Sequence, residues 1–242
     1  YIPVMDIREL TLTFAIPEFI SRYDLKPDAL AGFCLGHEGK GSLLSYLKYQ
    51  GLATGLSAGA GFPTSDYGSF SINIQVTQKG LEQYRDVIRY CFSYIRLLRE
   101  EGIPAYVFKE IKHMAELDYT YGNKGEGAER ASALAANMNR YPIEIAETVD
   151  YMYAALDQGP IESLLSYLRP DNMLCMLTAE GLETDSIEPY YGARYSYNIE
   201  KGSYYNSLFN PPPIKELALP QPNPFLPGEV TLLAERPVNL ID

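Results

Sequence analysis

The 242-residue sequence contains only two histidines, His37 and His113, and no tryptophan. A helical zinc site needs two imidazoles one turn apart. The stretches His37-Glu38-Gly39-Lys40-Gly41 and His113-Met114-Ala115-Glu116-Leu117 each lack the second one. We therefore expect no zinc on either. His37 is interpreted as a partly buried polar side chain, and His113 as a surface residue of a helix.

Other scarce features exclude further classes of function. The three cysteines, Cys34, Cys91 and Cys175, form no CxxC or Cys/His cluster and are interpreted as buried free thiols. A net charge of −11 disfavours nucleic acid as a partner, since that affinity depends on Lys and Arg. No apolar run reaches the length of about 18 residues that a membrane span needs, so none is expected.

Two catalytic motifs also fail. The stretch Gly39-Lys40-Gly41-Ser42 is not a phosphate-binding loop, because Cys34 stands where the first glycine belongs and Gly41 separates the lysine from the hydroxyl residue. These glycines are better explained by a tight turn and a close helix–sheet approach. No GxSxG elbow occurs. A serine nucleophile with a remote base cannot be located from sequence alone.

Periodicity predicts the secondary structure. Apolar residues alternate in Leu10–Ile16 and in Phe70–Val76, which indicates two strands. The small-residue stretch Leu52–Phe62 is interpreted as a strand antiparallel to the second of these, and Met173–Thr178 as another; Val230–Leu233 is a possible short one. Helices are expected at 27–50, 78–101, from Pro104 onward, at 128–138 and at 160–168. The first is broken near Gly36 to Gly41, with Ser42 as the N-cap of its second part and Gly51 as its end, and Gly102 ends the second. The helix from Pro104 is expected to turn Val107, Phe108, Ile111, Met114 and Leu117 inward.

This order of elements is strand, helix, strand, strand, several helices, strand. It favours the α+β class, with an antiparallel or mixed sheet and helices packed on one face. Residues 1–210 are interpreted as one domain. The Pro-rich residues 211–242 are interpreted as a linker that lies on the domain and leads to a missing downstream half. The sequence begins without Met or a signal core, so we expect it to be cut from a longer protein.

The strand Leu56-Ser57-Ala58-Gly59-Ala60-Gly61 has small side chains that leave its backbone accessible. At a sheet edge, such a strand can accept an extended peptide as an added strand. Inside the sheet, the same residues would instead serve tight packing. The sequence alone leaves both interpretations open.

Several stretches together resemble a known family. They are Leu35 to Lys48, Gly51 to Gly59, the helix from Leu81 to Gly102, Leu168 to Asn172, Tyr190 to Tyr195, and Leu219 to Pro227. In this order they are similar to the second, non-catalytic domain of long members of the insulinase/pitrilysin family of zinc metallopeptidases. The resemblance spans nearly the whole chain.

The resemblance implies four homologous α+β domains that enclose a chamber around peptides. The first domain supplies an HxxEH helix and zinc, whose bound water attacks the peptide bond. This chain has Gly36-His37-Glu38-Gly39 in the corresponding region, so it is expected to be inactive and to hold no cofactor of its own. Its implied partners are a peptide substrate, the catalytic domain and the other half of the same protease.

In the insulin-degrading members, this domain anchors the N-terminal end of the substrate by strand addition. The matching residues here are Gly32, Phe33, Gly36, Glu38, Leu56, Ser57, Ala58 and Ala60. Glu38 would pair with the substrate's amino terminus. Two positions depart from that pattern, since Phe33 replaces a polar histidine and Ala58 replaces a glycine. These changes imply a weaker anchor or one suited to other peptides.

Three hypotheses stay open at this stage. The domain is either a peptide anchor or a purely structural wall, like the scaffold subunits of processing peptidases; an independent enzyme with an unseen site is a third hypothesis. The compartment is also open. The resemblance implies a periplasmic location for a bacterial pitrilysin-like protein and a cytoplasmic one otherwise.

Overall fold

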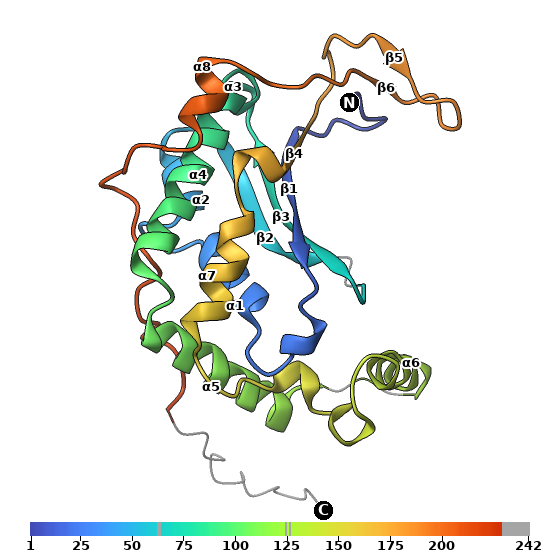
Figure 1. The fold of residues 1–242 in the computed structure, drawn as a ribbon, viewed down its shortest axis with the longest axis vertical. Coiled ribbons are helices and arrows are strands. Elements are labelled where there is room, and N and C mark those ends of the chain that lie inside the picture. Colours follow the sequence, from blue (N-terminus) through green and yellow to red (C-terminus); the bar gives the residue numbers. More distant parts are fainter. Residues whose placement is uncertain (62–63, 124, 126, 229–242) are drawn as a thin grey trace, which may run out of the picture.

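The computed structural model describes residues 1–61, 64–123, 125 and 127–228. At its centre is a four-stranded sheet in the order β2-β3-β1-β4 (Figure 1), in which every neighbouring pair is antiparallel. The strands are β1 (Glu9–Pro17), β2 (Ala53–Gly61), β3 (Tyr67–Val76) and β4 (Met173–Thr178). All four were predicted, and the sheet is antiparallel rather than mixed. β2 and β4 form its two edges.

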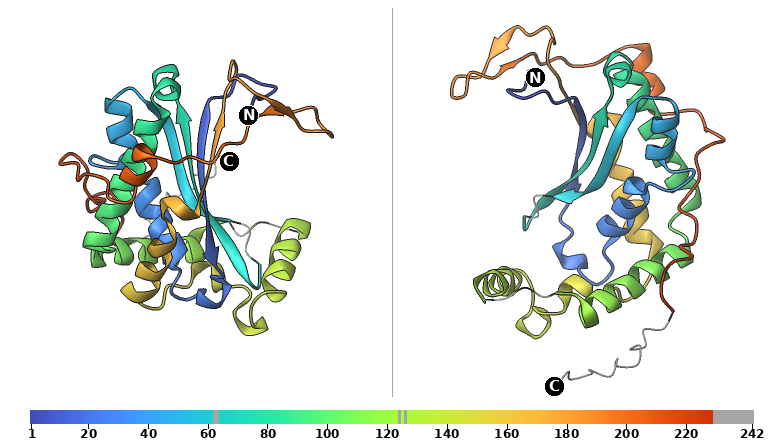
Figure 2. Two further views of the ribbon diagram at one scale, coloured as in Figure 1. Left: turned by 45° about the horizontal axis from the view of Figure 1, so that its top comes forward. Right: turned by 180° about the vertical axis from the view of Figure 1, so that it is seen from behind.

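The helices pack on one face of this sheet, as predicted (Figures 1 and 2). Those nearest to the sheet are α1 (Pro27–Gly36), α2 (Leu43–Tyr49), α4 (Tyr84–Glu101) and α7 (Gln158–Tyr167). The alternating residues of β1 and β3 explain this arrangement, because one set is fully buried beneath the helices: Leu10, Leu12, Phe14, Phe70, Ile72 and Ile74. On the opposite face, polar residues such as Thr13 and Ser71 share a hydrogen bond of 3.2 Å.

The helix ends follow local chemistry. Ser42 begins α2, and its hydroxyl oxygen accepts a bond from the Ser45 N–H at 3.0 Å. Gly51 and Gly102 follow α2 and α4 with φ of 70° and 67°, a conformation that favours glycine. The predicted N-cap and both glycine stops are therefore confirmed. Gly41, with φ of 84°, makes the turn before α2.

The predicted helix at 78–101 is divided into α3 (Gln78–Glu82) and α4, with a break at Gln83. A tertiary contact accounts for the short first part. A Cβ on Gly80 would lie 1.9 Å from the Leu52 carbonyl oxygen, so this glycine permits α3 to pack directly on the chain entering β2. The Thr77 hydroxyl caps α3 by accepting from the Gly80 N–H at 3.0 Å.

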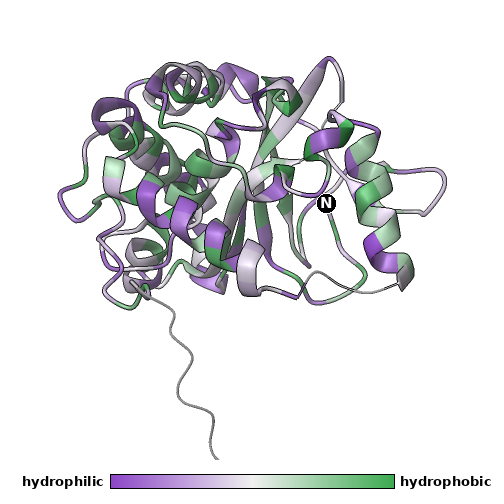
Figure 3. Cartoon of the chain, turned by 90° about the horizontal axis from the view of Figure 1, so that it is seen from below, coloured by the Kyte–Doolittle hydropathy of each residue, from purple (hydrophilic) through white to green (hydrophobic). Residues whose placement is uncertain are grey.

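Two helices extend away from the sheet. α5 (Ala105–Tyr121) buries only Val107 completely, and Met114, predicted to face inward, is 47% exposed. The helix continues past the sheet, so its far half has less to pack against (Figure 1). α6 (Gly127–Met138) stands apart and mixes hydrophilic with hydrophobic residues (Figure 3).

The remaining elements are short. They are β5 (Ser186–Ile187), β6 (Arg194–Tyr195), α8 (Ser203–Ser207) and the single 3-10 turns η1 (Ile20–Arg22), η2 (Ile143–Ile145), η3 (Val149–Tyr151) and η4 (Pro170–Asn172). β5 and β6 form a small hairpin in a stretch where the sequence predicted no element. Among the described residues, no helix is both long and apolar enough to cross a membrane.

The described part of the Pro-rich segment contacts the domain. Ala218 donates to the Gly41 carbonyl at 2.9 Å, and Tyr94 donates to the Ala218 carbonyl at 3.3 Å. Leu217 and Leu219 are buried in the core. The possible strand Val230–Leu233 lies outside the described residues.

The three thiols are unpaired, as expected, and burial differs among them. Cys34 and Cys91 are buried and Cys175 is half-buried. Burial raises the pKa of the Cys34 thiol to about 12 and that of Cys175 to about 11. Reactive cysteines have depressed values, so these thiols behave as core side chains.

Candidate peptide-binding groove

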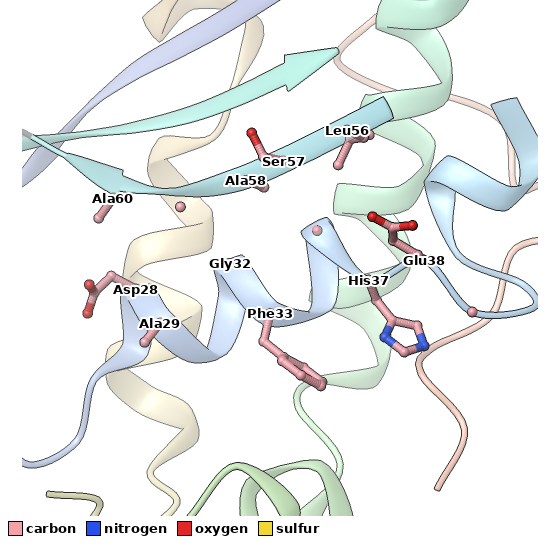
Figure 4. A pocket seen from close by; sticks show the side chains of 13 residues that line it. Asp28, Ala29, Gly32, Phe33, His37, Glu38, Leu56, Ser57, Ala58 and Ala60 are labelled. Carbon is pink, nitrogen blue, oxygen red and sulfur yellow. The ribbon is translucent and has the colours of Figure 1, made fainter. Parts of the chain in front are cut away.

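A groove of about 710 Å³ lies between α1 and the edge strand β2 (Figure 4). All eight predicted site residues line it: Gly32, Phe33, Gly36 and Glu38 from α1 and its C-terminal end, and Leu56, Ser57, Ala58 and Ala60 from β2. The fold therefore brings together two stretches that are more than 15 residues apart in the sequence. The small-residue strand is at an edge of the sheet and not in its interior.

The register fixes which backbone groups of β2 face the groove. The Val76 N–H donates to the carbonyl of Arg8, which precedes β1. The backbone N–H and C=O of residue 76 therefore point toward β1, and those of residue 75 point toward β2. Because these directions alternate along a strand, the backbone N–H and C=O groups of Ser57 and Gly59 point toward β3. The N–H and C=O groups of Leu56, Ala58 and Ala60 consequently point away from the sheet, toward the groove.

The floor of the groove is made by a glycine face of α1. Gly32 and Gly36 are four residues apart and so lie on the same side of the helix. A Cβ on Gly32 would be 3.1 Å from the Ala58 carbonyl oxygen and 3.2 Å from the Gly59 Cα, and one on Gly36 would be 3.4 Å from the Ala58 nitrogen. The sequence placed a close helix–sheet approach at Gly39 and Gly41, but the structure has it at Gly32 and Gly36.

A carboxylate stands at each end of the groove (Figure 4). Glu38 lies near Leu56, is exposed, and forms a long ion pair with Lys48 at 3.8 Å. Such an exposed pair is weak and leaves the carboxylate available. Asp28 lies at the Ala60 end. Burial raises the pKa of the Asp28 carboxyl, while the backbone N–H groups of Asp28 and Ala29 and the charge of Lys26 oppose the rise.

Asp28 was missed by the sequence analysis, although a signal for it existed. It precedes Gly32 by four residues, as Gly32 precedes Gly36, so helical spacing places all three on one face. The other groove residues that were missed are Ala29, His37, Gly39 and Gly59. The ring of His37 lies beside that of Phe33, with centroids 5.8 Å apart.

The two histidines lie on different elements. His37 follows α1 and is partly buried, as predicted. His113 on α5 was predicted as a surface residue, but it is half-buried: its Nε2 is 2.7 Å from the Pro227 carbonyl oxygen, so it contacts the C-terminal segment. Within the described ranges, no three His, Cys, Asp or Glu side chains gather closely enough to hold a metal ion. The donor set in this part of the chain does not fit a catalytic zinc ion.

Comparisons with known proteins agree with this geometry. Residues 1–115 match the family model described as the peptidase M16 inactive domain, and residues 119–240 match that of the middle or third domain of peptidase M16. The chain belongs to the peptidase M16 family. The predicted resemblance to the insulinase/pitrilysin proteins is thereby confirmed.

Similar M16 proteins are much longer than this chain. A nardilysin-like protein of Arabidopsis thaliana is 33% identical over 238 residues, which is 96% of this chain but 23% of the relative. The insulin-degrading enzyme of Homo sapiens is 32% identical over 234 residues, with the same two coverages. The chain thus spans about a quarter of the length of these relatives.

A solved structure supports the fold. The crystal structure of pitrilysin matches 96% of this chain and 25% of its own, with a TM-score of 0.88 and 24% sequence identity. The predicted α+β class is confirmed, and the chain is a non-catalytic M16 domain by its match to the inactive-domain model.

The glycine face can be tested with a matched pair of substitutions. We expect Gly32→Ala to destabilise the protein, because overpacking costs about 1–3 kcal/mol and exceeds the ~1 kcal/mol that alanine gains over glycine in a helix. Gly36→Ala, whose Cβ meets only ordinary contacts, should change the free energy of unfolding much less. Urea denaturation measures both. Equal stability of the two variants would contradict the close contact.

Proposed function

We propose that this chain is a non-catalytic domain of a larger zinc metalloendopeptidase. In that protein it forms part of the proteolytic chamber and anchors peptide substrates by strand addition along β2. The catalytic domain and the other half of the protease are its partners in the same assembly. The similarity to longer M16 proteins supports the first part of the proposal.

One observation carries the anchoring role. The outward backbone groups of Leu56, Ala58 and Ala60 border a groove whose floor is the glycine face of α1. An added peptide strand needs donors and acceptors spaced two residues apart along an edge, and room beside that edge. From Leu56 to Ala60 this edge extends about 13 Å, at roughly 3.3 Å per residue.

Glu38 gives the anchor a direction. It lies at the Leu56 end of the groove and carries the negative charge that favours an ammonium group. A peptide whose free amino terminus meets Glu38 would extend along β2 toward Ala60. A purely structural wall would instead show no binding in this groove, which the following experiments measure.

Strand addition predicts that peptide affinity falls when one backbone N–H donor of β2 is removed. Ala58→Pro in the full-length protein removes an N–H that faces the groove, while proline is tolerated on an edge strand whose N–H faces outward. We expect peptide affinity to fall at least about tenfold, as losing one buried hydrogen bond implies. Ala58→Ser keeps the N–H and should bind nearly normally. Fluorescence anisotropy with a labelled peptide measures both, and unchanged affinity in the proline variant would exclude strand addition.

The direction of binding is tested at Glu38. We expect Glu38→Gln to weaken binding of a peptide with a free amino terminus by about two- to fivefold, since an exposed ion pair contributes at most about 1 kcal/mol. The same peptide with an acetylated terminus should bind both proteins equally. Glu82→Gln, an exposed change outside the groove, is the control. Equal effects on both peptides would show that the Glu38 charge does not meet the amino terminus.

The assignment of zinc to another domain predicts the behaviour of the histidines. His37→Gln and His113→Gln in the full-length protein should each leave the bound zinc unchanged, because neither imidazole belongs to a set of ligands in the described part of the chain. Inductively coupled plasma mass spectrometry after dialysis measures the zinc content. Loss of the metal from either variant would place a ligand in this domain.

A further inference from the structure

The edge of the sheet formed by β4 differs in chemistry from the β2 edge. Its side chains on the face away from the helices are large and apolar, with Leu174 58% exposed and Met176 46% exposed. A cleft of about 770 Å³ separates β4 from residues 195–198, and Tyr1 is among its lining residues. The N-terminus lies close to β4 and β6 (Figure 1). A long apolar edge left open is an aggregation hazard, so proteins normally cover such edges.

Tyr1 already pairs with this edge. Its nitrogen donates to the Leu177 carbonyl at 3.0 Å, and its carbonyl accepts from the Ala179 N–H at 3.2 Å. Bonds to the two residues that flank Thr178 are the pattern of a parallel strand pair. The next residue, Ile2, donates to the Arg194 carbonyl of β6 at 2.9 Å, which holds the chain in this direction.

The register leaves further backbone groups of β4 free for the same pairing. Thr178 pairs with Glu9 of β1, and the outward direction of Leu177 and Ala179 is set by their bonds to Tyr1. By alternation, the N–H of Leu177 and both backbone groups of Cys175 also point away from β1. In the part of the chain that the structure describes, backbone hydrogen bonds to this side of β4 come from Tyr1.

We propose that the polypeptide leading into Tyr1 in the full-length protein continues along β4 as a fifth, parallel strand that fills the cleft. This rests on the proposed function only in that a polypeptide precedes Tyr1. The residue two positions before Tyr1 is then paired with Met176, and the one four positions before with Leu174. Paired residues of parallel strands point to the same face, so these two positions take apolar side chains and cover Met176 and Leu174.

Hydrogen exchange of the full-length protein, without added peptide, tests this strand. We expect the amides of Cys175 and Leu177 to exchange about 100-fold more slowly than the outward amides of Ala58 and Ala60 on the other edge. The protection should not depend on protein concentration, because the strand comes from the same chain. Exchange as fast as at the β2 edge would overturn the proposal, and protection that disappears on dilution would assign the cleft to a second copy instead.

A matched pair of variants strengthens the test. Met176→Lys places a charge against the apolar side of the added strand, and we expect exchange at Cys175 and Leu177 to accelerate at least about tenfold. Met138→Lys, at an equally exposed methionine on α6, should leave it unchanged. Equal effects would argue against an added strand. Peptide binding to β2 is a separate measurement, so anchoring can fail while β4 stays protected, and the reverse.

Discussion

The contact between the glycine face of α1 and the backbone of Ala58 is the constraint on which the groove depends. The Ala58 carbonyl oxygen would lie only 3.1 Å from a Cβ on Gly32, so any larger residue there would push the helix away from the strand. The helix is held from its other sides by the core, where Leu30, Cys34 and Leu35 are fully buried. The position of the groove floor is therefore set by packing energy and not by a flexible loop.

The two edges of the sheet differ in the side chains they present, and the sequence of each strand explains why. β2 carries Gly and Ala, so its outward backbone groups are reachable from the groove, with α1 alongside them. β4 carries Leu174 and Met176, whose exposed area is unfavourable in water. A ligand that binds and dissociates suits the β2 edge, because little apolar surface is exposed when the ligand leaves. A strand that stays bound suits the apolar β4 edge.

Much of the fold could be predicted because the signals are local. The alternation of apolar residues in Leu10–Ile16 and Phe70–Val76 predicted two strands, and Ser42 predicted the start of a helix. Where prediction failed, a distant contact decided the outcome. Gly80 packs on Leu52 in the short helix before the break at Gln83, which periodicity did not predict, and His113 contacts Pro227, 114 residues along the chain.

The groove itself could be found from sequence only through a family resemblance. The spacing of the glycines in α1 indicates that another part of the backbone approaches this helix closely. It does not indicate which strand approaches, since many strands could pack against such a glycine face. That β2 lies at an edge follows from the order in which strands pair, which no local pattern in Leu52–Phe62 encodes. Asp28 is the exception, because its spacing from Gly32 was readable and its place in the groove follows from helical geometry.

The chemistry of the groove also limits what it can select. Its contacts along β2 are backbone N–H and C=O groups flanked by Ala and Ser side chains, which do not distinguish one peptide side chain from another. Selection through such an edge acts on extended conformation, and the carboxylates at the two ends add a preference for positive charge. On the proposed function, the domain would hold many peptides in one orientation and leave the choice of the cleaved bond to a catalytic site elsewhere.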